Sequence, residues 1–422
     1  MNIKIHRGTG EIGGSCVEVW TASTRIVLDM GLPLVNPDGT PFKGKTYPGR
    51  LLPDIKGLFD GSGDIAVLIS HAHQDHYGLL DHVHDKCDIY LGKATQTLIE
   101  ITNLFTGKDW QIGRPHHFES GKSFMIGDIE ITPYLMDHSA YDAYAFLIQG
   151  EGKSLLYSGD FRSHGRKGRA FNWFKKNVKK HVDYLLLEGT TIGSNSHKSI
   201  SESDIEEQLV NLFDATEGIN LIYTSGQNID RLVSIFRACR RRRKFMVVDF
   251  YIAHILESLN NDSIPHPSNS SFPELKVFFP GNLTWRMKQQ NQKDLIDQLK
   301  MYEITKEEID LDYKKIVMLV RPSTKPYLNG ISNLSGGNFI YSLWSGYKKD
   351  SYTYNFIKYL ESRGLNSMDI HTSGHADIAT LKEMVKAVQP ANIVPIHTFA
   401  GDEYEKIFTG TNILRAKDGE VI

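Results

Sequence analysis

Cysteine is scarce in this chain, and that scarcity argues against two kinds of protein. The 422 residues contain three cysteines, Cys16, Cys87 and Cys239, which lie far apart and form no Cys-x-x-Cys pair. A disulfide framework needs a dense set of cysteines, and a thiolate metal site needs closely spaced ones. The sequence favours neither, and a reducing, cytoplasmic location is expected.

Long apolar runs are also lacking. Nowhere do eighteen apolar residues follow one another, and the first ten residues are polar and charged, without the apolar segment of a signal peptide. We therefore expect neither export nor a membrane-spanning helix. At 422 residues the chain exceeds what one hydrophobic core usually supports, so two domains are expected.

Net charge is nearly absent, at −2, and by itself it indicates no polyanionic partner. The distribution of charge is more informative. Two runs of basic residues stand out along the chain, and the second of them, 240–244, is interpreted as a solvated helix face. The first run, 161–182, follows a candidate metal ligand and contains no acid; its basic residues are Arg162, Arg166, Lys167, Arg169, Lys175, Lys176, Lys179 and Lys180.

The most informative motif is His-Ala-His-Gln-Asp-His at 71–76, directly after the apolar run 65–69. A lone histidine is usually a surface or hydrogen-bonded core residue. Four ligand-type side chains at the end of one strand would repel each other without a cation, so the motif predicts metal binding. His71 and His73 face one side of an extended segment, and Asp75 and His76 turn the other way, which suggests two adjacent metals.

Several further apolar segments end in a residue suited to chemistry. Ligands from separate strands that meet at one edge of a sheet are typical of α/β sites. His138 could complete the first metal site, and the carboxylate of Asp160 could bridge two cations. The expected strands and the residues that follow them are 24–28 with Asp29, 131–136 with His138, 154–157 with Asp160, and 184–187 with Glu188.

After Glu188 the pattern changes to alternating strands and helices, which predicts a separate α/β unit with a mostly parallel sheet. Ser203 and Glu206 are interpreted as a capping box that opens a helix. Strand 220–223 leads through the turn 224–228 into an amphipathic helix. Strand 245–248, helix 252–259 and a surface loop at 260–273 follow.

Near the end, strand 368–372 leads to Ser373-Gly374-His375, helix 377–388 follows, and strand 392–396 ends in His397. A strand-helix-strand unit places both histidines at one sheet edge, beside the expected metals. Residues 412–422 are expected to form a closing hairpin.

Together these motifs resemble those of the metallo-β-lactamase-fold nucleases of the β-CASP group, especially RNase J-like ribonucleases. Thr9 to Gly13 and Leu28 to Gly31 are similar to that group as well, and the resemblance spans essentially the whole chain. It implies an α/β fold, a four-layered αββα metallo-β-lactamase sandwich formed by residues 1–199 and 366–422, with an inserted α/β β-CASP domain at 200–365.

By the same resemblance, two Zn²⁺ ions are implied, with Mn²⁺ as the alternative. Asp29 and Glu188 would lie just behind the ligands. His375 would contact the scissile phosphate, and Ser373, Gly374 and the turn containing Ser225 would cradle neighbouring phosphates. One ion would be held by His71, His73, His138 and Asp160, and the other by Asp75, His76, Asp160 and His397.

The implied function is a zinc-dependent ribonuclease. Paired cations lower the pKa of water toward about 7, so a water can attack phosphorus and leave 5′-phosphate and 3′-hydroxyl ends. Asp75, His375 and Glu188 are the expected catalytic residues. RNA, in single-stranded form, is favoured because the family's RNA-directed members carry a histidine at the position of His397. Exonuclease and endonuclease modes and a homodimer are left open.

The chain departs from RNase J in two places, since it stops soon after the last motif and has Thr398-Phe399 where Gly-Glu is common. We therefore expect an RNase J-like enzyme. Three alternatives stay open: a DNA nuclease of the same group, a hydrolase of small esters or thioesters, and a non-catalytic RNA-binding subunit.

Overall fold

The computed structural model describes residues 1–34, 52–193 and 199–422. The chain divides into two compact units. The inserted domain expected at 200–365 stays a prediction. The second unit comprises Ile101–Asp109 and Ile200–Ser373, and the first comprises Met1–Glu100, Trp110–Ser199 and Gly374–Ile422. In the described part of the chain, no helix combines the length and apolarity needed to cross a bilayer.

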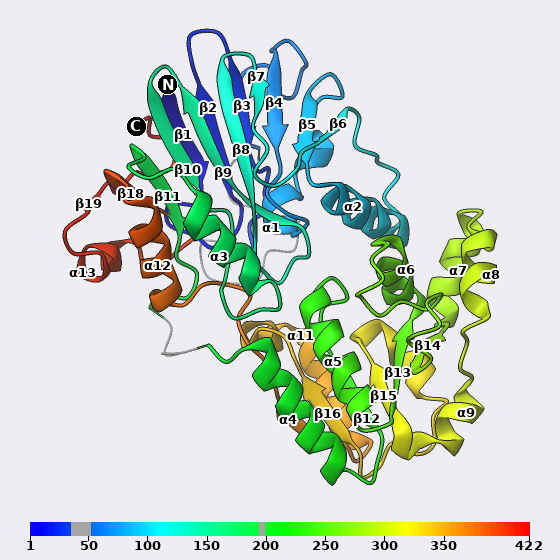
Figure 1. The fold of residues 1–422 in the computed structure, drawn as a ribbon. Helices are drawn as coiled ribbons and strands as arrows, with labels where there is room; N and C mark the ends of the chain where they lie inside the picture. Colours follow the sequence, from blue (N-terminus) through cyan, green and yellow to red (C-terminus); the bar gives the residue numbers. More distant parts are fainter. Residues whose placement is uncertain (35–51, 194–198) are drawn as a thin grey trace. The chain divides into compact units, whose positions relative to one another are not determined.

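The first unit contains two sheets, shown in Figure 1. One has six strands in chain order: β1 (Asn2–Arg7), β2 (Cys16–Trp20), β3 (Arg25–Leu28), β4 (Ile65–Leu68), β5 (Asp88–Leu91) and β6 (Pro115–His117). The other runs in the order β19 (Asn412–Ile413), β18 (Asn392–Ile396), β11 (Tyr184–Glu188), β10 (Lys153–Tyr157), β9 (Ala143–Gly150), β8 (Ile129–Met136) and β7 (Phe124–Ile126).

The two sheets share one core, because every second side chain of a strand points into the space between the sheets. In β9, Phe146 and Ile148 join a cluster with residues of β1 to β4, while Ala145 and Leu147 face the opposite side. Successive side chains of a strand point to opposite faces, so one strand can serve two layers. The α/β class predicted from the sequence is confirmed.

Helices cover the outer face of the seven-stranded sheet. Phe171 and Phe174 of α3 (Gly168–Asn177) pack in one cluster with Leu381 and Met384 of α12 (Ile378–Val388). The other helices of this unit are α1 (Gln74–Tyr77), α13 (Tyr404–Ile407), and the short 3-10 helices η1 (Leu80–His82) and η5 (Gly401–Glu403); α2 (Lys93–Thr106) runs from the first unit into the second.

The second unit has one six-stranded sheet that is parallel throughout, as the alternation of strands and helices predicted. Its strand order is β14 (Leu275–Phe278), β13 (Phe245–Asp249), β15 (Ile316–Leu319), β12 (Asn220–Tyr223), β16 (Asn338–Tyr341) and β17 (Asn366–Asp369). Its helices are α4 (Glu202–Ala215), α5 (Ile229–Arg241), α6 (Phe250–Ser258), α7 (Gly281–Gln289), α8 (Lys293–Lys300), α9 (Lys306–Leu311), α10 (Lys325–Leu328) and α11 (Ser351–Ser362), with η2 (Tyr313–Lys315), η3 (Pro322–Thr324) and η4 (Ser345–Lys349).

Three local predictions were wrong. The capping box of α4 is formed by Ser201 and Asp204, two residues earlier than predicted, because Glu206 lies inside the helix and pairs with Arg237 and Arg241. Residues 412–422 form no hairpin, since β19 pairs in parallel with β18 and Val421 bridges to Lys4.

The third wrong prediction is the strand-helix-strand unit near the end of the chain. β17 ends at Asp369, three residues earlier than expected, and belongs to the sheet of the second unit, while β18 belongs to the seven-stranded sheet of the first. Periodicity cannot tell which sheet a strand joins, because partner choice depends on contacts distant in sequence.

Candidate metal centre

The motif at 71–76 follows β4, where the chain leaves the sheet and enters α1. Asp29, directly after β3, anchors this loop by accepting hydrogen bonds from the Ser70 backbone N-H at 2.7 Å and from Ser70 Oγ at 2.8 Å. β3 and β4 are parallel neighbours, so their carboxyl ends meet at one edge of the sheet. His71 and His76 are fully buried there, and Asp75 is nearly so.

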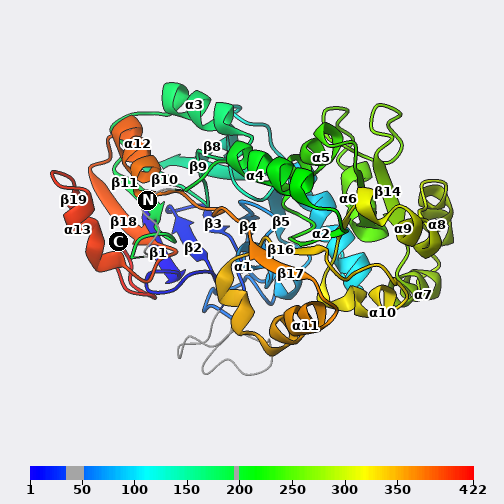
Figure 2. The same cartoon turned by 90° about the horizontal axis from the view of Figure 1, so that it is seen from below.

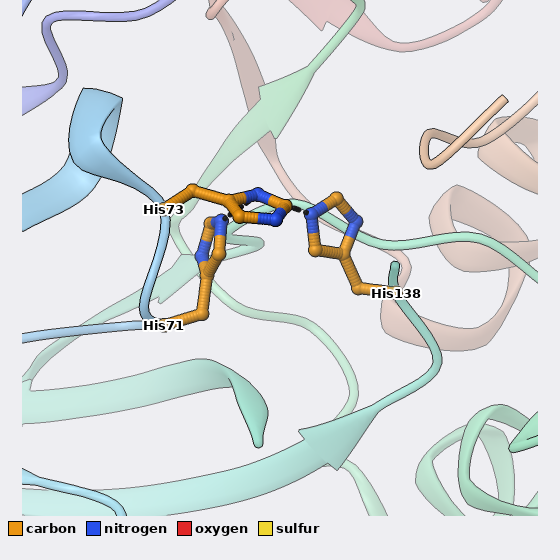
Figure 3. Close-up of side chains that lie close together, drawn as sticks. All are labelled: His71, His73 and His138. Carbon is orange, nitrogen blue, oxygen red and sulfur yellow. Dashed lines mark hydrogen bonds between the residues drawn. The ribbon is translucent and has the colours of Figure 1, made fainter. Parts of the chain in front are cut away.

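Three histidine rings converge at this edge, as Figure 3 shows. His71 Nε2 lies 3.1 Å from His73 Nδ1, which lies 3.2 Å from His138 Nε2. His138 Nδ1 donates to the carbonyl oxygen of Gly374 at 2.6 Å, so its Nε2 keeps the lone pair that faces the other two rings. This tautomer is the one that a metal ligand requires.

A second cluster adjoins the first, and its Asp160 also approaches a histidine of the first. Asp160 Oδ2 lies 3.1 Å from His76 Nε2 and 3.9 Å from His71 Nε2, one histidine from each cluster. His397 Nε2 lies 3.3 Å from Asp75 Oδ2 and completes the second cluster. The ligand atoms of Asp75, His76, Asp160 and His397 all lie within 4.8 Å of one another.

Burial and charge set opposite protonation tendencies in the two clusters. Burial lowers the pKa of His73 to about 4 and holds those of His71 and His138 well below the usual value, so these rings are neutral. Burial would also lower the pKa of His76, but the carboxylates of Asp160, Asp29 and Asp75 raise it well above its usual value. In the second cluster the carboxylates thus favour the protonated, positively charged form of His76.

The residues present fit a pair of divalent cations. Imidazole nitrogen and carboxylate oxygen are the donors that zinc accepts, and each cluster supplies three or more of them. Asp160 Oδ1 is buried and accepts no hydrogen bond from any described residue, although buried polar atoms are nearly always satisfied. A cation held by Asp160 would satisfy this oxygen.

Asp29 also holds a metal-ligand candidate from behind. Its Oδ2 lies 2.7 Å from His76 Nδ1 and accepts a hydrogen bond from the Tyr157 hydroxyl at 2.7 Å. His76 Nε2 is thereby left for the cluster. The sequence analysis placed Asp29 behind the ligands, but it missed two other supporting residues, Tyr157 and Thr190. Thr190 Oγ1 lies 2.8 Å from His397 Nδ1. The only signal for both was their position at or just beyond a strand end.

The Asp29→Asn substitution is expected to lower zinc affinity about 10- to 100-fold, because the amide can no longer accept both contacts and His76 loses its orientation. A competition titration with a chromogenic zinc chelator measures this. Tyr157→Phe is the matched control, since it removes one donor to Asp29 and leaves the contact with His76. Equal affinity in Asp29→Asn and the parent protein would contradict the role of Asp29.

His375 lies next to the second cluster and is oriented by Glu188. His375 Nδ1 lies 3.3 Å from Glu188 Oε2 and 3.6 Å from Asp160 Oδ2. Glu188 Oε1 accepts hydrogen bonds from the backbone N-H groups of Phe161 and Ala376, which hold the carboxylate in place. Burial alone would lower the pKa of His375, but the carboxylates of Glu188 and Asp160 raise it to about 9.

The expected phosphate-binding residues are distributed over both units. Gly374 lies at the metal centre, where its carbonyl accepts from His138. Ser373 and Ser225 belong to the second unit; Ser225 lies in the turn between β12 and α5, and its Oγ accepts from the Gln227 N-H at 3.3 Å. Their contact with phosphate stays a prediction.

Comparison with known proteins identifies the class. Residues 60–224 match the β-lactamase superfamily domain, and residues 367–400 match a domain described as the Zn-dependent metallo-hydrolase RNA specificity domain. The first match contains the His71 motif, His138, Asp160 and Glu188, and the second contains His375 and His397. These matches support a metal-dependent hydrolase of the metallo-β-lactamase superfamily with an RNA specificity domain of the β-CASP type.

Individual relatives are distant. The chain is 25% identical over 411 residues to Ribonuclease J of Helicobacter pylori strain B128, which covers 92% of this chain and 55% of that protein. It is also 25% identical over 264 residues to an RNase J-like protein of Methanocaldococcus jannaschii, covering 59% and 55%. The chain thus spans about half the length of the curated relatives it matches.

A solved structure shares the fold over the whole chain. A protein of unknown function from Enterococcus faecalis V583 superposes with a TM-score of 0.79, covers 100% of this chain and 99% of its own, and is 20% identical in sequence.

Proposed function

We propose that this chain is a zinc-dependent ribonuclease that hydrolyses phosphodiester bonds of single-stranded RNA and leaves 5′-phosphate and 3′-hydroxyl ends. The observation that carries the proposal is the pair of adjoining ligand clusters joined through Asp160, with His375 beside them. Paired cations with an adjacent proton donor suit the hydrolysis of a phosphodiester, where negative charge grows on phosphoryl oxygens.

Two bound zinc ions would supply Lewis-acid charge and lower the pKa of water toward about 7. The remaining roles belong to the protein. Asp75 would hold one cation, and it keeps His397 in position. Glu188 orients His375, whose side chain is 21% exposed while those of Glu188 and Asp160 are only 1% exposed. His375 can therefore reach a bound phosphate and donate a proton to the departing oxygen.

The preference for RNA is supported by the second domain match, which carries RNA specificity in its description and includes His375 and His397. The RNase J relatives support the same substrate class. Ser373, Gly374 and Ser225 are proposed to bind phosphates beside the scissile bond. Because an activated water attacks, the 2′-hydroxyl takes no part in the chemistry, and RNA preference rests on binding contacts.

The proposal is tested with RNA and DNA oligomers of matched sequence, labelled at the 5′ end, with and without a 5′ phosphate. We expect rapid cleavage of single-stranded RNA that stops in EDTA and resumes with added zinc or manganese. Release of labelled mononucleotide from the start indicates an exonuclease, and a ladder of fragments indicates an endonuclease. Faster cleavage of DNA, or hydrolysis confined to small esters, would refute the proposal.

A further inference from the structure

The acid-free basic run at residues 161–182 is the sequence feature that the metal centre does not explain. Without its eight lysines and arginines, the rest of the chain has 40 basic residues against 50 acidic ones. The run forms α3 and the segments on either side of it. Positive charge is therefore concentrated in α3 and its two flanking segments, in a chain that is otherwise acidic.

The sequence of α3 separates a buried face from an exposed one. Phe171 and Phe174 are buried in the core under the seven-stranded sheet. Arg169, Trp173 and Lys176 follow each other at intervals of four and three residues, which places them on one face, and all three are exposed. Trp173 is 42% exposed, and its ring centroid lies 6.0 Å from that of Tyr134.

Helix α12 extends this surface. Figures 1 and 2 both show α3 and α12 side by side, and Lys175 Nζ forms an ion pair with Glu383 Oε2 at 2.5 Å. Lys382 and Lys386 of α12 are exposed. An open hollow of about 500 Å³ lies between the two helices and is lined by Lys175, Lys180, Glu383, Lys386 and Ala387. We call the exposed side chains of α3, its C-terminal flank 178–180 and α12 the basic ridge.

The lysines of the basic ridge differ from the second basic run in their partners. Lys176, Lys180 and Lys386 form no hydrogen bond or ion pair with any described residue. In the second run three of the four guanidinium groups are paired with acids of the same unit: Arg240 with Glu274, Arg241 with Glu206 and Glu207, and Arg242 with Asp214. Most of the charge of the second run is thus neutralised within the unit, whereas the ridge offers three unpaired lysines to an external anion.

The basic ridge begins at the metal centre. Lys167, just before α3, donates to the backbone carbonyl of His138 at 3.0 Å. Asp377, which caps α12, comes two residues after His375. Helix α3 has ten residues and is about 15 Å long, so its exposed face leads away from the metal ligands over that distance.

We propose that the basic ridge binds the phosphate backbone of single-stranded RNA beyond the nucleotides held at the metal centre, with Trp173 as a stacking platform for one base. Unpaired lysines beside an exposed aromatic ring are the combination by which proteins hold single strands without reading sequence. A lipid surface would attract the lysines as well, but a membrane-binding helix needs a broader apolar face than Trp173 provides. The proposal rests on the proposed function for its choice of polymer.

The test compares two triple variants of the full chain with equal loss of charge. One is Lys176→Gln, Lys179→Gln, Lys180→Gln on the basic ridge. The other is Lys86→Gln, Lys122→Gln, Lys406→Gln, which removes exposed lysines scattered over the same unit. Binding of a long, fluorescently labelled single-stranded RNA is followed by anisotropy over a range of salt concentrations, with Asp75→Ala present in every variant to prevent cleavage.

We expect the ridge variant to bind the long RNA about tenfold or more weakly, and the slope of log affinity against log salt to fall by about 2, since each phosphate contact to a single strand contributes about 0.7. The scattered variant should match the parent. Trp173→Ala should weaken binding by about tenfold and leave the slope unchanged, because stacking is not a charge interaction.

Hydrolysis assays separate the proposal that the basic ridge binds RNA from the proposal that the chain is a ribonuclease. With Asp75 restored, the ridge variant should cleave bis(p-nitrophenyl) phosphate and a trinucleotide at the parent rate and lose efficiency only on long RNA. Equal losses in both triple variants, parent-like binding by the ridge variant, or a loss confined to anionic lipid vesicles would overturn the ridge proposal. Ridge-dependent binding without hydrolysis of any RNA by the parent would instead refute the ribonuclease proposal.

Discussion

The Asp160→Asn substitution is expected to remove bound zinc and to lower RNA hydrolysis about a thousandfold or more. Asp160 approaches both ligand clusters, and its Oδ1 has no hydrogen-bond donor among the described residues. An asparagine of the same shape offers a single weak donor oxygen and no charge. Paired cations contribute several kcal/mol to the transition state, which corresponds to the expected loss of rate.

Metal content by elemental analysis and initial rates on labelled RNA measure this effect. Asp128→Asn is the matched control, since Asp128 is an exposed turn carboxylate that accepts from Thr21 Oγ1 at 2.7 Å, in the turn between β7 and β8. Thermal unfolding followed by circular dichroism shows whether each variant is folded. A folded Asp160→Asn protein with the parent's zinc content and rate would rule out the proposed centre.

The His375→Ala substitution is expected to lower the rate of RNA hydrolysis about 10²- to 10⁴-fold while zinc content stays unchanged. His375 is a member of neither ligand cluster, although its ligand atom lies within 4.8 Å of those of Asp160, Glu188 and His397, and Glu188 holds it at the border of the clusters. Its loss therefore removes a proton donor and leaves the expected metal ligands in place.

Two further variants separate proton donation from positioning. Glu188→Gln should lower the turnover number less than His375→Ala and shift the basic limb of the pH-rate profile to lower pH, because the amide holds the ring but no longer raises the pKa of His375. His82→Ala, which removes an exposed histidine of η1, should behave like the parent. Loss of zinc in His375→Ala would make His375 a ligand and contradict the assigned role.

The local parts of the centre could be predicted because they follow the carboxyl ends of strands. An apolar run and a ligand-type residue after it identified the loop at 71–76 and the residues Asp29, His138, Asp160 and Glu188. Parallel neighbours such as β3 and β4 bring such residues to one edge, so pattern and spacing are sufficient.

Other parts of the centre depend on contacts between residues far apart in the sequence, which no local sequence pattern predicts. The carbonyl of Gly374 sets the tautomer of His138, which lies 236 residues earlier in the chain, and Thr190 holds His397 from 207 residues away. His375 and His397 were expected to lie together because the strands before them were assigned to one sheet. These strands belong to different sheets. The two rings are nevertheless neighbours, with centroids 5.6 Å apart. Helix capping was misplaced by two residues for a similar reason, because two serines near the start of α4 could each serve as the cap.

The sequence by itself determined the α/β class, the type of each donor and the strand ends where the donors lie, because these follow from periodicity and from side-chain chemistry within a few residues. Only the tertiary structure decided that two clusters meet at Asp160, that Asp29 and Tyr157 lie behind His76, and that Arg240, Arg241 and Arg242 are paired with acids while Lys176 and Lys180 have no partner among the described residues. These features depend on which distant segments pack together. The free energy of that packing comes from the whole core, so no local sequence pattern predicts these contacts.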